Sequence, residues 1–441
     1  MPLPVQPTTG LKHLRSRILA RHARVVVLGQ GYVGVTLAAA VANAGFQVTG
    51  IDIDVERVAA LARDELPVAG VDERIFREAT ASDRLTFAID ASTIGEADVI
   101  SVCVPTPLRD HVPDLTDIQR ASADVALHLR PGSLVILEST SYPGTTDEIV
   151  RDILEASGLV VGRDFLLAYS PERIDPGNRE FGLGNTPKLV GGTTVESAEI
   201  AVTFYEQLVD KVVPLSSARV AEAAKLFENT FRHVNIALVN ELAMLCHELG
   251  IDIWEVLDAA ATKPFGFMAF EPGPGIGGHC IPLDPAYLSW KIRRESGHRF
   301  KLLDLAEDIN DHMPGYVTAR VGEILNDDRR AMKDATVLVL GVAYKPDVGD
   351  IRESPALRTM QALHKAGADV QFHDPYVDRV SLNGGTVARV DLGSAVPAAD
   401  VVVLLTPHSA YDLEELAGQA KKIFDTRNAY RGERPENVVS L

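Results

Sequence analysis

Short apolar runs alternate along the chain with longer segments of helical spacing. The first run, residues 25–28, leads into a glycine-rich turn, an alanine-rich stretch that ends at Gly45 and a second run that ends at Asp52. This order of elements is typical of a βαβ unit. Further apolar runs occur at residues 97–105, 132–140 and 165–172. We therefore predict a mostly parallel, doubly wound sheet that extends to about residue 205.

The pattern changes to continuous helical spacing from Ser217 to Gly250. This segment contains no proline, and its terminal glycine is suited to end a helix. A helix of roughly thirty residues exceeds the usual length in globular proteins. We interpret it as a spine that joins domains, followed by more helical sequence to about residue 330.

A second βαβ pattern begins near residue 335. Its later run "ADVVVLLTP" (399–407) repeats "ADVISVCVP" (97–105) in sequence and in position within the unit. We interpret this as a weak internal repeat and predict two sheets of related design on either side of the helical spine.

Length and composition fit this division, because 441 residues, 46% of them hydrophobic, can fill more than one core. We predict an α/β chain with two doubly wound Rossmann-like domains joined by a central helical region. The expected boundaries are 1–23 for an N-terminal extension, 24–210 for the first sheet domain, 211–325 for the helical region and 326–441 for the second sheet domain.

The charge balance limits the partners. A formal net charge of -18 repels polyanions, so we expect no nucleic-acid or anionic-membrane binding, and an anionic ligand must be held by a few local Arg and Lys side chains. Residues 25–51 are uncharged, but their glycines indicate a strand, a turn and a helix rather than a membrane span. The three widely separated cysteines favour a reducing cytoplasm over a disulfide framework.

Gly29, Gly31 and Gly34 form a G-x-G-x-x-G turn between a strand and a helix. The first glycine permits a tight turn, the second lets a pyrophosphate approach the backbone, and the third allows close packing of helix and strand. Asp52 ends the next strand, where it can accept hydrogen bonds from ribose hydroxyls and repel a 2′-phosphate. We therefore predict NAD rather than NADP, although the nearby Arg57 leaves that choice open.

Cys280 lies in "PGPGIGGHCIPLDP" (272–285), a segment of glycines and prolines. Cys103 and Cys246 are interpreted as small buried hydrophobes. The sequence after Cys280 resembles a helix start, where the dipole favours a thiolate, so we predict that Cys280 is a nucleophile. We do not expect His279 to act as the base for Cys280, because the side chains of adjacent residues in an extended loop point in different directions.

Two further pairs of polar residues are candidates. Lys225 and Asn229 are one turn apart on the predicted spine helix, a pattern that also fits a solvated stripe. Glu172 and Arg173 follow a predicted strand, where open α/β sheets present ligand sites, but acids at strand ends are often only loop residues.

Together these segments resemble the UDP-glucose/GDP-mannose dehydrogenase family of four-electron nucleotide-sugar dehydrogenases. The resemblance covers nearly the whole chain from about residue 24, and it is carried by "GQGYVG", "VPTP", "ESTSYPGTT", "SPERIDPGN", "AKLFENTFRHVNIALVNE", "GGHCIPLDP" and "GVAYKPDVGDIRESPA". It implies an N-terminal NAD-binding domain, a central dimerisation region that contains the cysteine loop, and a C-terminal domain that binds the UDP part of the substrate. A homodimer or higher homo-oligomer is expected.

The resemblance also implies roles for individual residues. Cys280 resembles the family nucleophile, and Asp284 the acid near the thiol. Lys225 and Asn229 resemble the residues beside the reacting carbon, and Thr140 and Glu172 the pair that positions water. The residues expected to bind NAD are Gly29, Gly31, Tyr32, Val33, Gly34, Asp52, Arg57, Thr106 and Thr140; those expected to bind the UDP-sugar are Glu172, Arg173, Lys225, Asn229, Gly277, Lys345 and Arg352. No metal site is expected.

The chemistry that the resemblance implies accounts for the cysteine. An aldehyde formed at carbon 6 is trapped by Cys280 as a thiohemiacetal, and a second oxidation gives a thioester that is hydrolysed to the uronate. We expect the loop glycines to let the substrate approach the thiol and the prolines to restrict the loop.

One departure from the UDP-glucose enzymes concerns the sugar. Where they commonly read S-P-E-F-L-R-E-G, this chain has "SPERIDPG" with Pro176, and Arg173 and Asn178 are expected at that strand end. We expect UDP-N-acetylglucosamine as the substrate, with UDP-glucose and UDP-N-acetylmannosamine as alternatives. A two-electron hydroxyacid dehydrogenase and a non-catalytic NAD-binding protein remain as alternatives of other classes.

Overall fold

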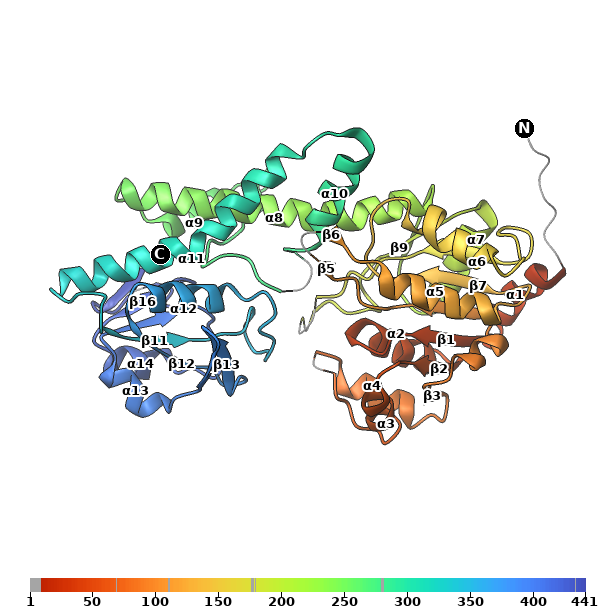
Figure 1. Ribbon diagram of the computed structural model, residues 1–441, viewed down its shortest axis with the longest axis horizontal. Coiled ribbons are helices and arrows are strands. Elements are labelled where there is room, and N and C mark those ends of the chain that lie inside the picture. Colours follow the sequence, from red (N-terminus) through yellow and green to blue (C-terminus); the bar gives the residue numbers. More distant parts are fainter. Residues whose placement is uncertain are drawn as a thin grey trace. The chain divides into compact units, whose positions relative to one another are not determined.

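The computed structural model describes residues 9–68, 70–109, 112–175, 178, 180–278, 281–432 and 434–441. The chain forms two compact units (Figure 1). The first contains residues up to Glu228 together with Ala286–Gly297, and the second contains Asn229–Pro285 and His298–Leu441. Both units are built around a mostly parallel sheet, so the predicted α/β class with two doubly wound sheets is confirmed.

The sheet of the first unit has eight strands in the order β10-β9-β8-β7-β4-β1-β2-β3. Their bounds are β1 (Arg24–Leu28), β2 (Gln47–Ile51), β3 (Leu85–Ala88), β4 (Val99–Val102), β7 (Leu134–Leu137), β8 (Leu166–Tyr169), β9 (Lys188–Gly192) and β10 (Val212–Leu215). All neighbours pair in parallel except β8 and β9, which are antiparallel. The sheet thus continues about ten residues beyond the predicted end at 205.

Helices cover both faces of this sheet, because alternate residues of each strand point to opposite sides. Val25 and Val27 belong to one apolar cluster, whereas Val26 and Leu28 belong to another. The helical segments are α1 (Thr9–Leu19), α2 (Tyr32–Asn43), α3 (Val55–Leu61), α4 (Glu73–Thr80), η1 (Ala91–Glu96), α5 (Thr116–His128), η2 (Thr145–Val150), α6 (Arg151–Glu155) and α7 (Val195–Tyr205), and a short ribbon is formed by β5 (Leu108–Arg109) and β6 (Val112–Pro113).

Helix α1 lies within the segment that the sequence set apart as an extension. Leu14 and Ile18 are fully buried in the same apolar cluster as Val25 and Val27. At least this part of residues 1–23 therefore contributes to the core of the first sheet domain.

The predicted spine is α8 (Ala218–Glu248), a continuous helix of 31 residues. Gly250 follows it with φ 68°, the left-handed conformation of a glycine that ends a helix. The other helices of the central region are α9 (Ile253–Ala261), α10 (Asp284–Ser296) and α11 (Lys301–Asp327). None of the helices in the described part of the chain is both long and apolar enough to cross a membrane.

The second unit has a five-stranded parallel sheet in the order β12-β11-β15-β16-β17. Its elements are β11 (Thr336–Leu340), α12 (Pro355–Lys365), β12 (Asp369–His373), the hairpin β13 (Arg379–Leu382) and β14 (Gly385–Ala388), α13 (Leu392–Ala398), β15 (Val401–Leu404), α14 (Leu413–Gln419), β16 (Ile423–Asp425) and β17 (Val438–Ser440). In this sheet β15 lies beside β11, as β4 lies beside β1 in the first sheet. The internal repeat predicted from the two "ADV" segments is confirmed.

Candidate active site

The glycine turn has the three functions expected from its spacing. Gly29 has φ 87°, and a Cβ atom added there would lie 2.6 Å from the carbonyl oxygen of Cys103. A Cβ atom at Gly34 would lie 1.7 Å from the carbonyl oxygen of Gly29, so only glycine allows α2 to pack so closely on the turn. At Gly31 nothing lies within 4 Å. The middle glycine therefore faces open space that a ligand can enter.

Helix α2 begins directly after Gly31, with Tyr32 and Val33 as its first residues. The N-cap residue is Gly31, which makes no side-chain cap, and the N-terminus of a helix attracts an anion. The turn therefore fits the pyrophosphate of a dinucleotide.

Asp52 is held in place at the end of β2. Its Oδ2 accepts a hydrogen bond from the backbone N–H of Gln30 at 2.6 Å, and its Oδ1 accepts one from Asp54 at 2.9 Å. Arg57 Nη1 lies 3.0 Å from Oδ2 of Asp52, and its Nη2 lies 3.3 Å from Asp54. Arg57 is paired with both Asp52 and Asp54, so its charge is not reserved for the 2′-phosphate of NADP. This arrangement agrees with NAD as the cofactor.

The segment that contains Thr140 is fixed by Glu222, a residue that the sequence did not single out. Thr140 itself is partly exposed. Glu222 is fully buried on α8 and accepts hydrogen bonds from the backbone N–H groups of Gly144 (2.7 Å) and Thr146 (2.9 Å) and from the Thr146 hydroxyl (2.7 Å). Burial raises the pKa of Glu222 to about 7, although these hydrogen bonds act in the opposite direction. Glu222 therefore ties α8 to the turn after Thr140.

Thr106 lies in the predicted "VPTP" segment. Its carbonyl oxygen accepts a hydrogen bond from the hydroxyl of Tyr287 at 2.8 Å. This contact joins the segment after β4 to α10 within the first unit.

Glu172 belongs to a buried ionic cluster. Its Oε2 lies 3.0 Å from Lys188 Nζ, which also lies 2.8 Å from Oε2 of Glu138. The hydroxyl of Tyr205 donates to Oε1 of Glu138 at 2.7 Å. Glu138 directly follows an apolar run, and this position at a strand end could have marked it as a candidate site residue. Lys188 gives no such signal, because a lysine at the start of a strand is usually exposed.

Arg173 does not present a free guanidinium. Its Nη2 and Nε lie 2.6 and 3.2 Å from the carboxylate of Glu228, and Nη1 donates to the carbonyl oxygen of Pro187 at 2.7 Å. Asn178 accepts from the backbone N–H groups of Glu180 and Phe181, so it too is used within the protein. Pro176, on which the prediction about the sugar depends, lies outside the described residues.

The cysteine segment is described on both sides of His279 and Cys280, which themselves lie outside the described residues. Asn229 Nδ2 donates to Oδ2 of Asp284 at 2.5 Å, and both side chains are buried. Lys225 is also buried, one turn before Asn229 on α8. The interpretation of these two residues as a solvated stripe is therefore wrong.

The sequence after Cys280 is expected to start a helix, and α10 begins within it, at Asp284. Cys280 itself lies outside the described residues. The effect of the helix dipole on its thiol therefore stays a prediction.

Two side chains on α8, those of Asn240 and His233, hold the described parts of this segment against that helix. Asn240 on α8 accepts from the backbone N–H of Gly273 at 2.9 Å and donates to Asn310 on α11, also at 2.9 Å. Asn310 in turn donates to the carbonyl oxygen of His233 at 3.3 Å. Burial lowers the pKa of His233, and a hydrogen bond with the backbone of Ile281 acts against this change. The residue after Cys280 is thereby joined to α8.

The loop glycines pack closely against other parts of the protein. Added Cβ atoms would lie 2.4 Å from Arg427 at Gly273, 2.7 Å from Pro355 at Gly277 and 2.8 Å from Tyr344 at Gly278. These glycines allow close contact with the second sheet domain. Since Cys280 lies outside the described residues, the approach of a substrate to its thiol stays a prediction.

Lys345 and Arg352 lie in the long connection between β11 and α12. Arg352 is exposed, and its guanidinium contacts both carboxylate oxygens of Asp350 at 2.6 to 3.0 Å. Lys345 is partly buried. The backbone of Arg352 accepts from Gly278 at 3.2 Å, so this connection contacts the cysteine segment.

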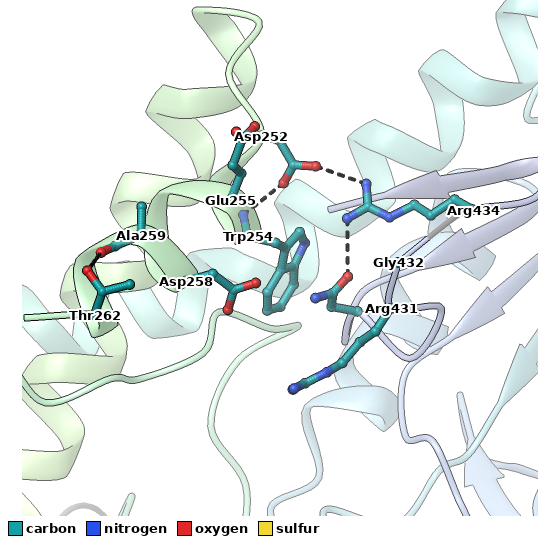
Figure 2. Close-up of a pocket in the computed structure, with 10 residues that line it drawn as sticks. Asp252, Trp254, Glu255, Asp258, Ala259, Thr262, Arg431, Gly432 and Arg434 are labelled. Atoms are coloured by element: carbon teal, nitrogen blue, oxygen red, sulfur yellow. Dashed lines mark hydrogen bonds and ion pairs between the residues drawn. The ribbon is translucent and has the colours of Figure 1, made fainter.

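A cavity of about 460 Å³ lies elsewhere in the second unit, between α9 and the loop that precedes β17 (Figure 2). Asp252 lies 3.1 Å from Arg434, which donates to Asn428 at 3.1 Å. None of the residues predicted to bind NAD or the sugar lines this cavity. The two arginines that line this cavity, Arg431 and Arg434, are paired with Glu271 and Asp252. We therefore assign the candidate active site from the glycine turn and the cysteine segment, and not from this cavity.

The other two cysteines are as expected. Cys103 and Cys246 are buried free thiols. Burial raises the pKa of Cys103 well above its usual range, and nearby Glu138 adds to this effect, so the thiol is neutral and unreactive.

A G-x-G-x-x-G turn at the switch point of a doubly wound sheet, with Asp52 at the next strand end, defines a dinucleotide-binding domain that fits NAD. Residues 23–209, 219–312 and 338–432 match the NAD binding, central and UDP binding domains of the UDP-glucose/GDP-mannose dehydrogenase family. The chain belongs to this family and is an NAD-dependent nucleotide-sugar 6-dehydrogenase, not a hydroxyacid dehydrogenase or a non-catalytic NAD-binding protein.

Relatives with acetamido-sugar names are similar over most of the chain. A UDP-N-acetyl-D-glucosamine 6-dehydrogenase of Pseudomonas aeruginosa is 37% identical and covers 80% of this chain and 83% of its own. A UDP-N-acetyl-D-mannosamine dehydrogenase of Pyrococcus horikoshii is 34% identical, covering 88% of this chain and 90% of its own. The solved structure of the UDP-D-ManNAc dehydrogenase from Pyrococcus horikoshii has a TM-score of 0.86 at 33% identity and covers 95% of this chain and 98% of that one.

Proposed function

We propose that this protein oxidises carbon 6 of UDP-N-acetylglucosamine to the uronate with NAD. The observation that carries this proposal is the 37% identity to the Pseudomonas aeruginosa enzyme named for that reaction. The departure from the UDP-glucose pattern at "SPERIDPG" supports an acetamido sugar over glucose. UDP-N-acetylmannosamine is the second candidate, favoured by the Pyrococcus horikoshii relative and its structure.

The proposed site assigns the cofactor to the first sheet domain. The glycine turn of Gly29, Gly31 and Gly34, with the first turn of α2 at Tyr32 and Val33, holds the pyrophosphate. Asp52, oriented by Gln30 and Arg57, accepts from the ribose, and Thr106 and Thr140 flank the nicotinamide side. NAD, when bound, supplies a hydride acceptor for each of two oxidations.

The residues of the cysteine segment and of α8 carry the covalent steps in this proposal. The Cys280 thiolate adds to the aldehyde carbon and gives a thiohemiacetal, and oxidation of that carbon gives a thioester. Lys225 stabilises negative charge on the sugar oxygen, and Asn229 and Asp284 hold the segment in register. Water adds to the thioester carbon, the C–S bond breaks, and the thiol of Cys280 and the carboxylate product are released. Thr140 and Glu172 position that water.

The nucleotide part of the substrate is assigned to the second sheet domain. Lys345 and Arg352 supply positive charge for the diphosphate, and Gly277 contributes backbone contacts. Arg173 can contact the sugar only if it leaves Glu228, so we expect it to act mainly by orienting the strand end. The proposed division is an N-terminal segment (1–23) whose helix α1 packs on the NAD domain, the NAD domain itself (24–210), a central region (211–325) and a UDP domain (326–441).

We also propose a homodimer through the central region, in the cytoplasm. Three large apolar side chains are exposed at helical spacing along α8: Phe231, Leu238 and Leu245. A stripe of this kind in a soluble protein is typical of a subunit interface. Leu238→Glu should shift the molecular mass in light scattering toward the monomer; an unchanged dimer mass would argue against this face. The buried free thiols of Cys103 and Cys246 support a reducing compartment.

The substrate proposal is tested by competition. Equal concentrations of UDP-N-acetylglucosamine, UDP-N-acetylmannosamine and UDP-glucose are incubated with enzyme and NAD, and the consumption of each is followed. We expect UDP-N-acetylglucosamine to be consumed first, with the highest kcat/KM. A site whose polar groups bond the acetamide should reject glucose strongly, whereas an apolar pocket would discriminate by only ~10- to 200-fold. Preferential consumption of UDP-N-acetylmannosamine would refute UDP-N-acetylglucosamine as the preferred substrate and favour the second candidate.

A further inference from the structure

Lys188 joins three strand ends in the first sheet domain. It is the first residue of β9 and is 2% exposed. Its Nζ lies 2.8 Å from Oε2 of Glu138, which follows β7, and 3.0 Å from Oε2 of Glu172, which follows β8. Because β9 runs antiparallel to β8, its first residue lies at the carboxyl ends of β7 and β8, where open α/β sheets bind ligands.

The contacts of Glu172 leave little capacity for further hydrogen bonds. Its Oε1 accepts from the backbone N–H groups of Arg173 at 2.6 Å and Ile174 at 2.8 Å, and its Oε2 accepts from Lys188. Each carboxylate oxygen has about two acceptor positions. Within the described part of the chain, Oε1 is therefore filled, and Oε2 can accept one more donor.

The charges around Lys188 are unequal. Two carboxylates share one ammonium group, and the groups beside them are the Tyr205 hydroxyl, bonded to Glu138 at 2.7 Å, and the neutral thiol of Cys103. Burial alone would lower the pKa of Lys188, but the two carboxylates raise it overall. Burial would likewise raise the pKa of Glu172, but Lys188 and the two backbone donors lower it overall. The cluster therefore contains a permanent cation and an ionised Glu172.

We propose that Lys188 is a positioning residue that keeps Glu172 ionised with a single acceptor position, so that Glu172 accepts a hydrogen bond from water and does not act as a proton donor. This inference rests on the role of Glu172 in the proposed function. A purely structural tie between β7, β8 and β9 would use the same contacts, but it would not make activity depend on the charge at residue 188.

The test compares the acid limb of the kcat profile, measured as NADH release against pH, in two charge variants. Lys188→Gln removes the cation, so the pKa of Glu172 rises and the limb moves to higher pH, with activity recovered at alkaline pH. Glu138→Gln removes the competing carboxylate, so the pKa falls and the limb moves to lower pH. Charge effects at this distance predict shifts of about one pH unit or more in opposite directions.

Lys188→Arg preserves the positive charge, so the acid limb of its kcat profile should lie at the same pH as in the wild type. Lys211→Gln is the matched control, because Lys211 is exposed and only its backbone oxygen accepts from Lys188. NAD titration of each variant reports that the domain is folded. Loss of activity by the same factor at every pH in Lys188→Gln, or an unmoved limb in both Lys188→Gln and Glu138→Gln, would overturn the proposal.

Glu172→Gln separates failure of this inference from failure of the proposed function. If Glu172 positions the water, the kcat profile of Glu172→Gln should show no acid limb, and the variant should form little uronate. Wild-type uronate formation by Glu172→Gln would remove the assumed role of Glu172 and, with it, the inference about Lys188. Impaired Glu172→Gln together with an unmoved limb in the two charge variants would overturn the inference alone.

Discussion

The two sheet domains place an aspartate at the same position but use it differently. Asp52 follows β2 and accepts from the turn after β1, and Asp374 follows β12 and accepts from Val342 and Ala343 in the turn after β11. The partner of Asp52 is Arg57, close to the surface, whereas Asp374 is fully buried against His408 at 3.0 Å. The backbone N–H of Asp347 donates to Nδ1 of His408, so Nε2 is the ring nitrogen that donates to Asp374.

The helices that follow the first strands differ as well. Helix α2 starts at Tyr32 without a side-chain cap, but α12 starts only at Pro355, and the hydroxyl of Ser354 occupies its N-terminus. We therefore expect an anion to bind at the start of α2, whereas the N-terminus of α12 is already capped by Ser354. Two sheets of related design thus differ in the turn after the first strand.

The largest expected effect is that of Gly34→Ala. The added Cβ atom would lie 1.7 Å from the carbonyl oxygen of Gly29, so the turn and α2 must separate. We expect a loss of stability of more than about 3 kcal/mol and no NAD binding. Thermal unfolding and NAD titration measure both. Gly31→Ala is the matched control, because the space beside Gly31 is open: its melting temperature should stay near that of the wild type while the Kd for NAD rises.

Gly341→Ala applies the same change to the second domain. A Cβ atom there would lie 2.2 Å from the carbonyl oxygen of Thr406, so the variant should also be destabilised. Because the cofactor turn is untouched, NAD binding should persist wherever the protein is folded. Loss of NAD binding by folded Gly341→Ala would contradict the division of roles between the two sheets.

The next effect distinguishes the two aspartates. Asp52→Asn should weaken NAD binding and narrow the preference over NADP, because the amide neither repels a phosphate nor offers two acceptor oxygens. Asp374→Asn should lower stability, since it disturbs a buried pair with His408, but leave the cofactor preference unchanged. Kd values for both cofactors decide between these outcomes, and a wild-type preference for NADP would refute the role given to Asp52.

A smaller, pH-dependent effect is expected at Glu222. Its pKa is about 7 in the folded protein and 4.5 without the fold's influence, so the folded state holds the proton more tightly. The contribution of this group to stability is therefore present below pH 4.5 and is lost as the pH rises through about 7. Between pH 5 and pH 8 the melting temperature of the wild type should fall relative to that of Glu222→Gln by a few °C. A difference independent of pH would contradict the raised pKa.

The sequence predicted the elements whose signals are local. The spine helix was placed within two residues of α8, and the glycine turn, Asp52 and the repeat of β4 in β15 could all be recognised from spacing. Contacts between distant segments could not be predicted in this way. Lys188 meets Glu138 across 50 residues, and Glu222 meets Gly144 across 78.

The close packing of the glycines in the cysteine segment could not be predicted for a related reason. Four glycines near a candidate nucleophile suggested space for a substrate, but glycine permits close approach of any group, and here the neighbours are Tyr344, Pro355 and Arg427. A single sequence does not distinguish a ligand from another part of the chain. For the same reason, the sequence could not show that the guanidinium of Arg173 is paired with Glu228.

The most direct test of the proposed chemistry is the ratio of NADH formed to sugar consumed. With limiting UDP-N-acetylglucosamine and excess NAD, we expect the wild type to form two molecules of NADH and one uronate per sugar, because both oxidations occur at carbon 6. Cys280→Ala should retain NAD and UDP-sugar binding but form no net uronate, because no covalent thiohemiacetal can be made. Two molecules of NADH per sugar at the wild-type rate in Cys280→Ala would contradict the role of this thiol, and one per sugar in the wild type would contradict four-electron oxidation.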